Sequence, residues 1–205
     1  MKTLAILICS FIFSKCVESQ NPQASKIIGG PCEGCEAIYE YADKTLTAID
    51  TLPDFNKMER NIKISGKVFL KDGKTPAKDV ILYFYHTNDK GIYPKKPDSK
   101  GWELRHGYLR GWVKTNENGM YTIYTSRPAS YPNSKMPQHI HVTIKEPNKN
   151  EYYIDDFFFA DDPNLTTDIK NKKKPRGGSG IISLNKDSPQ SATRDIILGL
   201  NIPNY

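Results

Sequence analysis

The chain has 205 residues, of which 38% are hydrophobic and 11% are aromatic, and it contains 14 Gly and 14 Pro. This composition excludes collagen, a long coiled coil and bulk disorder, and it is typical of one turn-rich globular domain. The net charge is +6, but the basic residues are scattered, and their densest run, at 172–176, includes a proline typical of a solvated loop. We therefore expect no nucleic-acid partner.

The first residues of the chain predict export. Residues 3–13 form an apolar stretch with the length of a signal-peptide core, too short to span a membrane. Small residues before Gln20 favour cleavage there, which makes residues 1–19 a signal peptide. Cys16 keeps a second route open, lipid attachment after cleavage just before it. We expect a periplasmic or extracellular protein, free or anchored as a lipoprotein, without a membrane span.

Residues 20–59 are expected to form an N-terminal arm, with one short helix within 37–51. Cys32 and Cys35 form a CxxC pair, and in an oxidising compartment such a pair favours a local disulfide that pins a loop. A structural zinc site needs two more Cys or His ligands at suitable spacing, and the sequence has no second CxxC and no HxxxH. A thioredoxin-type site needs a βαβ context, which this stretch lacks. The preferred interpretation is therefore a structural clip.

From residue 60 the hydrophobic pattern has a period of two, which predicts β-strands. Turn residues separate the strands, and no helical period is long enough to connect parallel strands. We predict an all-β fold over residues 60–205, an antiparallel β-sandwich or barrel followed by a loop-rich C-terminal tail with a late strand at 196–200. The predicted strands of the core are 62–70, 79–86, 111–114, 120–125, 138–145 and 152–159.

Two histidines and two tyrosines are candidate metal ligands. His139 and His141 stand at positions i and i+2 of an apolar strand, so both imidazoles point to one face of the sheet. Such a pair alone is more often a surface or core feature than a metal site. Tyr93 and Tyr131, however, lie on loops framed by Gly and Pro, where binding groups concentrate.

The order of the motifs around these residues resembles the intradiol ring-cleavage dioxygenases, which are non-haem Fe(III) enzymes typified by protocatechuate 3,4-dioxygenase and catechol 1,2-dioxygenase. The resemblance covers about residues 60–165 and implies a prealbumin-like β-sandwich. The matching segments are Gly91-Ile92-Tyr93, Arg110-Gly111, 115–121, 127–132 and 137–141.

The resemblance implies that Tyr93, Tyr131, His139 and His141 bind one Fe(III) per chain. Phenolate oxygen and imidazole nitrogen suit this ion, and a phenol with a pKa near 10 ionises at neutral pH only beside a strongly charged cation. The implied substrates are a small aromatic diol and O2, and the implied product of cleavage between the two hydroxyls is a cis,cis-muconate. Tyr131 is the ligand expected to dissociate when the diol binds, and so to act in catalysis.

One departure from the family pattern leaves the activity open. Members commonly carry an Arg three residues before the first His of the pair, and this chain has Met136 there. A guanidinium would stabilise negative charge beside the substrate. Arg127 is our candidate catalytic replacement, and Lys135 and Arg110 are others. The alternative role for Arg127 is an ion pair that braces a loop.

Two other functions stay open at this point. Segments 66–76 and 115–121 also resemble exported transthyretin-like and carboxypeptidase-regulatory-like β-sandwich modules, which have a binding or structural role without metal or catalysis. The histidine pair would suit a zinc hydrolase, although Glu146 follows His141 by five positions, beyond the expected end of the strand. The sequence also leaves open which diol is bound and whether the chain forms a homo-oligomer.

The remaining histidines and acidic pairs are expected to have structural roles. His86 and His106 are predicted to be structural or solvent-facing. The pairs Asp155-Asp156 and Asp161-Asp162 lack the spacing of a calcium-binding loop, and we expect them to cap turns.

Overall fold

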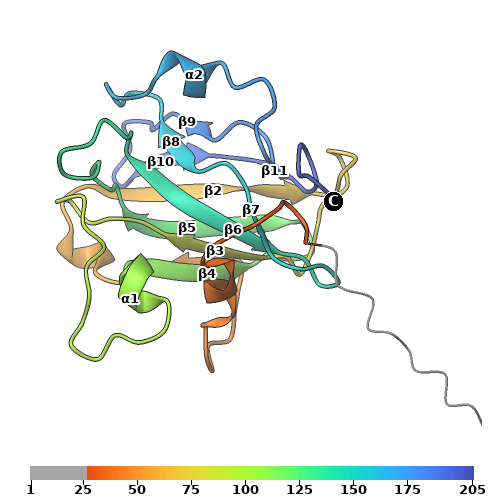
Figure 1. The fold of residues 1–205 in the computed structure, drawn as a ribbon, viewed down its shortest axis with the longest axis horizontal. Helices are drawn as coiled ribbons and strands as arrows, with labels where there is room; N and C mark the ends of the chain where they lie inside the picture. The colour runs from red at the N-terminus through yellow and green to blue at the C-terminus, as the bar shows by residue number, and fades with distance from the viewer. Residues whose placement is uncertain (1–26) are drawn as a thin grey trace, which may run out of the picture.

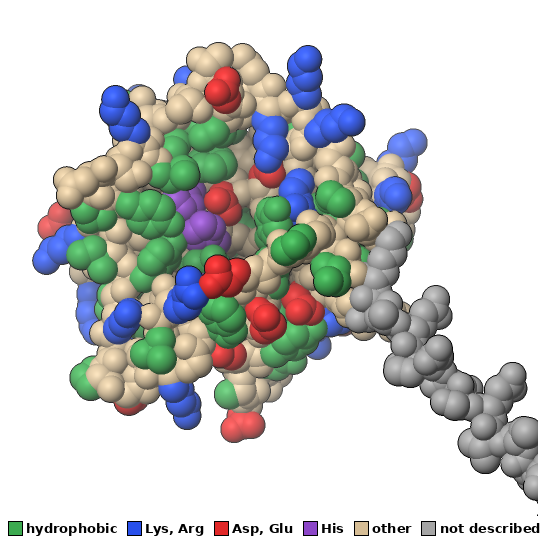
Figure 2. Space-filling view, in the orientation of Figure 1, with side chains coloured by type: hydrophobic (Ala, Val, Ile, Leu, Met, Phe, Trp, Pro, Cys, Tyr) green, Lys and Arg blue, Asp and Glu red, His purple; other side chains and the backbone are tan. Residues whose placement is uncertain are grey.

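The computed structural model describes residues 27–205, and the expected cleavage site before Gln20 and Cys16 lie outside the described residues. Two β-sheets pack face to face, and the helices are short segments outside them (Figure 1). Lys and Arg side chains are spread over the visible face rather than gathered in one patch (Figure 2). No helix within residues 27–205 has the length and apolar character needed to cross a membrane.

The first sheet is built on two long antiparallel strands and is extended by both ends of the chain. Its strands are β1 (Ile49–Thr51), β2 (Asn61–Phe69), β5 (Met120–Ser126), β10 (Gln190–Thr193) and β11 (Ile196–Ile197). β2 and β5 pair antiparallel, from Asn61 opposite Ser126 to Lys67 opposite Met120. β1 adds to β5, and β10 and β11 add to β2, all by parallel pairing.

The second sheet carries the candidate site. Its strands are β3 (Ile81–Tyr85), β4 (Arg110–Lys114), β6 (His139–Lys145), β7 (Tyr152–Tyr153), β8 (Phe157–Phe159) and β9 (Ile181–Ile182). β3 lies between β4 and β6 and pairs antiparallel with both, so that Tyr85 stands opposite His141. β6 also pairs with β8, which places His139 opposite Phe158.

Alternating residues of the two sheets meet in the main hydrophobic core. β2 contributes Ile62, Ile64 and Val68, and Leu82 and Phe84 of β3 meet them from the other sheet. This alternation is the pattern that a half-buried strand needs, because successive side chains point to opposite faces. The predicted all-β antiparallel sandwich is confirmed, with parallel pairing limited to the short strands at its edges.

The N-terminal arm covers part of the outer face of the second sheet. Tyr83 and Trp112 pack there against Ala37 and Ile38 of the 3-10 helix η1 (Cys35–Tyr39). Burial of these aromatic rings removes a large apolar area from water and so fixes the arm to the sheet. The arm is therefore part of the folded unit.

Three predicted elements have different bounds. Within 37–51, the helical part ends at Tyr39, and residues 49–51 form β1 because they complete the edge of the sheet beside β5. The strand expected over 152–159 is divided into β7 and β8, since Asp156 leaves the ladder and bonds to His141. The late strand at 196–200 is only two residues long.

Short helical turns complete the fold, and a disulfide pins the start of the arm. Cys32 and Cys35 are joined, with their Cα atoms 5.6 Å apart, which confirms the predicted clip. The helical turns besides η1 are η2 (Phe55–Lys57), α1 (Glu103–His106) and α2 (Thr167–Lys170).

Candidate metal centre

Two histidines reach the outer face of the second sheet from β6. His139 and His141 point outward, while Ile140 between them is fully buried in the main core. This alternation follows from the period of two along a strand. The two tyrosines come from loops: Tyr93 follows β3, and Tyr131 lies between β5 and β6.

Four donor atoms of these side chains converge. The Tyr93 and Tyr131 hydroxyl oxygens are 2.6 Å apart, and Tyr93 Oη lies 2.9 Å from His141 Nε2. Tyr131 Oη lies 3.1 Å from His139 Nε2 and 3.3 Å from His141 Nε2. Ligands bonded at about 2.0–2.1 Å to one ion at right angles to each other stand roughly 3 Å apart, so these separations suit a shared metal.

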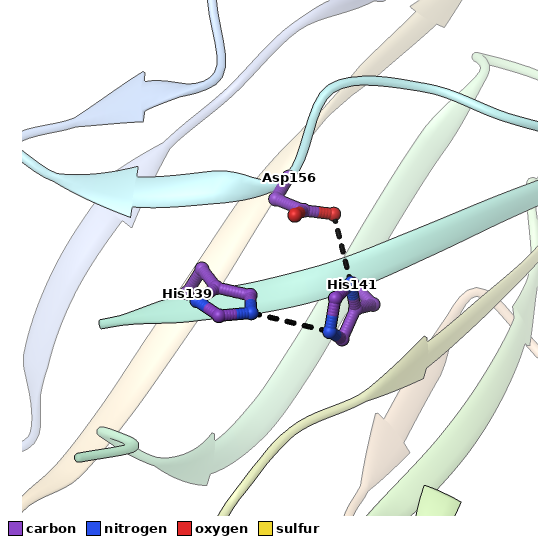
Figure 3. A group of neighbouring side chains, drawn as sticks. All are labelled: His139, His141 and Asp156. Atoms are coloured by element: carbon purple, nitrogen blue, oxygen red, sulfur yellow. Dashed lines mark hydrogen bonds and ion pairs between the residues drawn. The ribbon is translucent and has the colours of Figure 1, made fainter. Parts of the chain in front are cut away.

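The second nitrogen of each imidazole is anchored, which orients the first. His139 Nδ1 bonds to the Pro137 carbonyl oxygen at 2.6 Å, and His141 Nδ1 bonds to Asp156 Oδ1 at 3.1 Å (Figure 3). A carbonyl and a carboxylate only accept, so in the neutral rings each Nδ1 carries the hydrogen. The two Nε2 lone pairs then face each other at 3.2 Å, an arrangement that a cation between them stabilises.

Burial keeps this donor set uncharged in the absence of a cation. Burial raises the pKa of the Tyr93 phenol, and the hydrogen bond with Tyr131 raises it further. Burial also raises the pKa of Tyr131 and lowers the pKa of His139. Both phenols are therefore protonated at neutral pH unless a strongly charged ion binds them. The donor set of two phenols and two Nε2 lone pairs fits a hard, highly charged metal ion.

Asp156 is a candidate site residue that the sequence did not reveal, and the turn-capping role expected for it is wrong, because its carboxylate bonds to His141. His139, His141 and Asp156 form a group that could hold a metal ion, with donor atoms within 4.8 Å of one another. Its carboxylate contacts His141 Nδ1, the nitrogen directed away from the tyrosines. Burial acts to raise the pKa of Asp156, but electrostatic attraction and a hydrogen bond from His141, with further attraction from His139 and Arg194, outweigh it, and the pKa is lowered. We therefore assign Asp156 to the support of His141 rather than to the shared centre.

An aromatic stack backs the centre on the side of α1. The Tyr85 ring stacks on His141 with centroids 4.4 Å apart and also stacks on His106 with centroids 3.8 Å apart. His106 Nδ1 also bonds to the Tyr83 hydroxyl at 2.9 Å, and burial lowers the pKa of His106 to about 4. The expected structural role of His106 therefore includes a place in the wall of the site.

The structural roles predicted for His86 and for the pair Asp161-Asp162 have different outcomes. His86 is fully buried and bonds to Thr125 Oγ1 at 2.6 Å, so its structural role is confirmed. The Asp162 carboxylate accepts a hydrogen bond from the backbone N–H of Asn164 at 2.8 Å, as a turn cap does. It also accepts one from the backbone N–H of Gln138. Asp161 instead forms an ion pair with Arg127.

Arg127 makes the contacts expected of its alternative role, an ion pair that braces a loop. Arg127 donates to both carboxylate oxygens of Asp161 at 2.8 Å and to Gln138 Oε1 at 2.7 Å. Its guanidinium also lies over the Phe159 ring, 4.5 Å from the centroid. None of these partners is one of the four metal-ligand candidates. The catalytic role of Arg127 stays a prediction.

The other cations considered as replacements for the missing Arg are Arg110 and Lys135. Arg110 is paired with Glu40 and Glu103. Met136 itself is 46% exposed. The cation that lines the cavity beside the ligands is Arg105, which pairs with Glu33 of the disulfide loop.

A cavity of 240 Å³ opens beside the four donor atoms. Its wall includes the candidate ligands Tyr93, Tyr131 and His141. The remaining lining residues are aromatic or charged: Glu33, Tyr85, Trp102, Arg105 and His106. Room for a small molecule therefore exists next to the centre.

Fold and site together define a class of protein: an all-β sandwich that brings two tyrosines and two histidines to one centre. A dioxygenase family model matches residues 37–191, so the match is wider than the segment 60–165 expected from motifs. The chain belongs to the intradiol ring-cleavage dioxygenase family. The family and the fold are those of enzymes that cleave catechol-type rings.

Solved structures share this fold. The chain is similar to the dioxygenase domain of a dioxygenase carbohydrate-binding protein fusion from Streptomyces sp. SirexAA-E, with 21% identity and a TM-score of 0.57 over 82% of this chain and 95% of that one. It is similar to an intradiol ring-cleavage dioxygenase from Tetranychus urticae, with 19% identity and a TM-score of 0.53 over 77% and 88%. The chain is also similar to catechol 1,2-dioxygenase from Acinetobacter radioresistens, with 15% identity and a TM-score of 0.54, and it covers 59% of that protein. Identities this low establish the fold alone.

Proposed function

We propose that the chain binds one Fe(III) through Tyr93, Tyr131, His139 and His141, and uses O2 to cleave a catechol-type ring between its hydroxyls to a cis,cis-muconate. The observation that carries the proposal is the convergence of two phenol oxygens and two Nε2 atoms, with separations of 2.6–3.3 Å. A zinc hydrolase site would more usually include an acidic ligand. Here the nearby carboxylate, Asp156, contacts the far nitrogen of His141.

Bound at these four residues, Fe(III) would act as a Lewis acid that promotes ionisation of the phenols and of the diol. The protein contributes two neutral imidazoles with fixed directions, because Pro137 and Asp156 hold the Nδ1 hydrogens of His139 and His141. It also contributes two phenols whose pKa values burial has raised, so that each takes back a proton readily once it leaves the ion.

Tyr131 is the proton acceptor in this proposal. The diol must lose two protons as it binds: the phenolate oxygen of Tyr131 can take one of them at Oη, and the other can pass to hydroxide in the adjoining cavity. Tyr131 lies on a loop and is half-buried, so its ring can withdraw while the strand keeps the histidines in place. The neighbouring Tyr93 hydroxyl, 2.6 Å away, offers a hydrogen bond to the withdrawn phenol.

Export is part of the proposal and rests on the sequence of residues 1–19. The Cys32–Cys35 disulfide supports it, because disulfides persist mainly in oxidising compartments.

An anaerobic titration tests the proposed function. The iron-loaded protein is titrated with catechol, protocatechuate and hydroxyquinol while the visible spectrum is recorded, and oxygen is then admitted. We expect a spectral shift with at least one diol, followed by formation of the ring-opened acid. Absence of any shift with all three diols would contradict the proposal, and a shift without turnover would assign the loss of catalysis to Met136.

A further inference from the structure

A second cavity, of 310 Å³, lies on the other side of His141. Glu33, Tyr85 and His141 line both this cavity and the one beside the tyrosines. The two spaces therefore adjoin across the same imidazole, and Figure 2 shows histidine side chains at the edge of a hollow in the molecular surface. Sites for small molecules usually measure about 300–1,000 Å³, so the first cavity alone is small and the two together are of ordinary size.

The second cavity is built by β6 and by the disulfide loop of the N-terminal arm. Thr143 follows His141 by two positions, so both side chains point to the same face of the strand. The opposite wall is the segment Pro31–Gly34, and Cys35 Sγ lies 3.9 Å from Thr143 Oγ1. The disulfide closes this loop on itself, and the packing of Ala37 and Ile38 on the sheet places the loop beside Thr143, so the cavity has a wall on both sides.

The charge of the second cavity is negative. Among its lining residues in the described part of the chain, the charged side chains are Glu33 and Asp156. Asp156 is 28% exposed and uses one carboxylate oxygen for His141. The rings of Tyr85 and Tyr153 complete the wall, but their faces are occupied, Tyr85 by His106 and His141 and Tyr153 by Arg176. Arg105, the partner of Glu33, lines the first cavity instead.

We propose that the second cavity is a subsite for a substituent on the ring of the diol, and that it favours a cationic aminoalkyl substituent over a carboxylate. This inference rests on the proposed ring-cleaving function and specifies its substrate class. The carboxylates of Asp156 and Glu33 attract an ammonium group and repel a carboxylate.

Selectivity among three matched diols tests the subsite. The kcat/KM and the anaerobic dissociation constant are measured for catechol, 4-(2-aminoethyl)catechol and 3,4-dihydroxyphenylacetate. The wild type should prefer the amine to the acid by about tenfold or more, since the two carboxylates attract the ammonium group and repel the carboxylate. Glu33→Gln should reduce this preference by about threefold.

A variant of Thr143 tests the shape of the subsite. Thr143→Leu narrows the cavity and should lower the kcat/KM of the amine by about fivefold more than that of catechol. An amine-to-acid ratio near one in the wild type, with catechol cleaved, would overturn the subsite and leave the proposed function intact. Failure to bind or cleave any of the three diols would overturn both. If Thr143→Leu does not fold, the wild-type ratio and its change in Glu33→Gln still decide.

Discussion

The two halves of the candidate metal centre are held in different ways. His139 and His141 stand on β6, which is paired on both sides within the sheet, and each ring has a second bond through Nδ1. Tyr93 and Tyr131 stand on loops, and the ring of each is partly exposed. The strand half keeps its direction without help from a metal, and we expect the loop half to be the more movable one.

This difference matches the chemistry expected of the centre. A diol that binds through two oxygens needs room, and a ligand on a loop can leave more readily than one on a central strand. The histidines would remain in place during the reaction, and Tyr131 would be the exchangeable member. Each of the following changes tests the division between a fixed half and a movable half.

Removal of a fixed ligand should have the largest effect. In His141→Ala, we expect loss of stoichiometric iron and a fall in kcat/KM of about 1,000-fold or more, because the centre loses a donor and the partner of Asp156. Metal content and steady-state kinetics provide the measurement. His86→Gln is the control, since His86 is buried but bonds to Thr125 away from the centre. Full iron retention in His141→Ala would refute the assignment of this ligand.

Removal of the movable ligand should affect rate more than metal binding. Tyr131→Phe deletes the proton acceptor, and kcat should fall by about 100-fold while iron remains bound through the other three ligands. Single-turnover kinetics with catechol measure this, and Tyr124→Phe is a matched control on the first sheet. A variant that keeps the wild-type kcat would show that Tyr131 takes no proton.

Support of the fixed half comes next in size. Asp156→Asn keeps the shape of the side chain but weakens its bond to His141 Nδ1, so iron affinity should fall by about 10- to 100-fold. Competition with a chelator gives the affinity. An unchanged affinity would mean that Asp156 does not orient His141.

The smallest expected effect on catalysis is that of Arg127. As a brace between Gln138 and the exposed Asp161, it should contribute about 1 kcal/mol to the free energy of unfolding. Arg127→Gln and Asp161→Asn should therefore lose similar stability in urea, and both should keep kcat/KM within about threefold of the wild type. A 100-fold loss of kcat/KM in Arg127→Gln alone would support the catalytic role predicted from the sequence.

The strand half of the centre was predictable because strand period is local. Alternation around His139 and His141 places both rings on one face whatever the rest of the chain does. The loop positions of Tyr93 and Tyr131 also followed from adjacent Gly and Pro residues. Their convergence with the histidines could be expected only from the family resemblance, because it depends on packing between distant segments.

Features that arise from long-range packing were missed. Asp156 looks like a turn residue in the sequence, and only the break between β7 and β8 turns it toward His141. The stack of His106 on Tyr85 depends on where α1 docks. The helix expected within 37–51 ends at Tyr39, and the strand at 49–51 was missed for the same reason, since pairing with β5 outweighs a weak local preference there.

The visible spectrum of the iron-loaded protein tests the central claim most directly. With one Fe(III) per chain, the wild type should show a tyrosinate-to-iron charge-transfer band, and this band should weaken and shift in Tyr93→Phe. A wild-type protein that binds iron without such a band, or a Tyr93→Phe variant with an unchanged spectrum, would contradict the four-ligand centre.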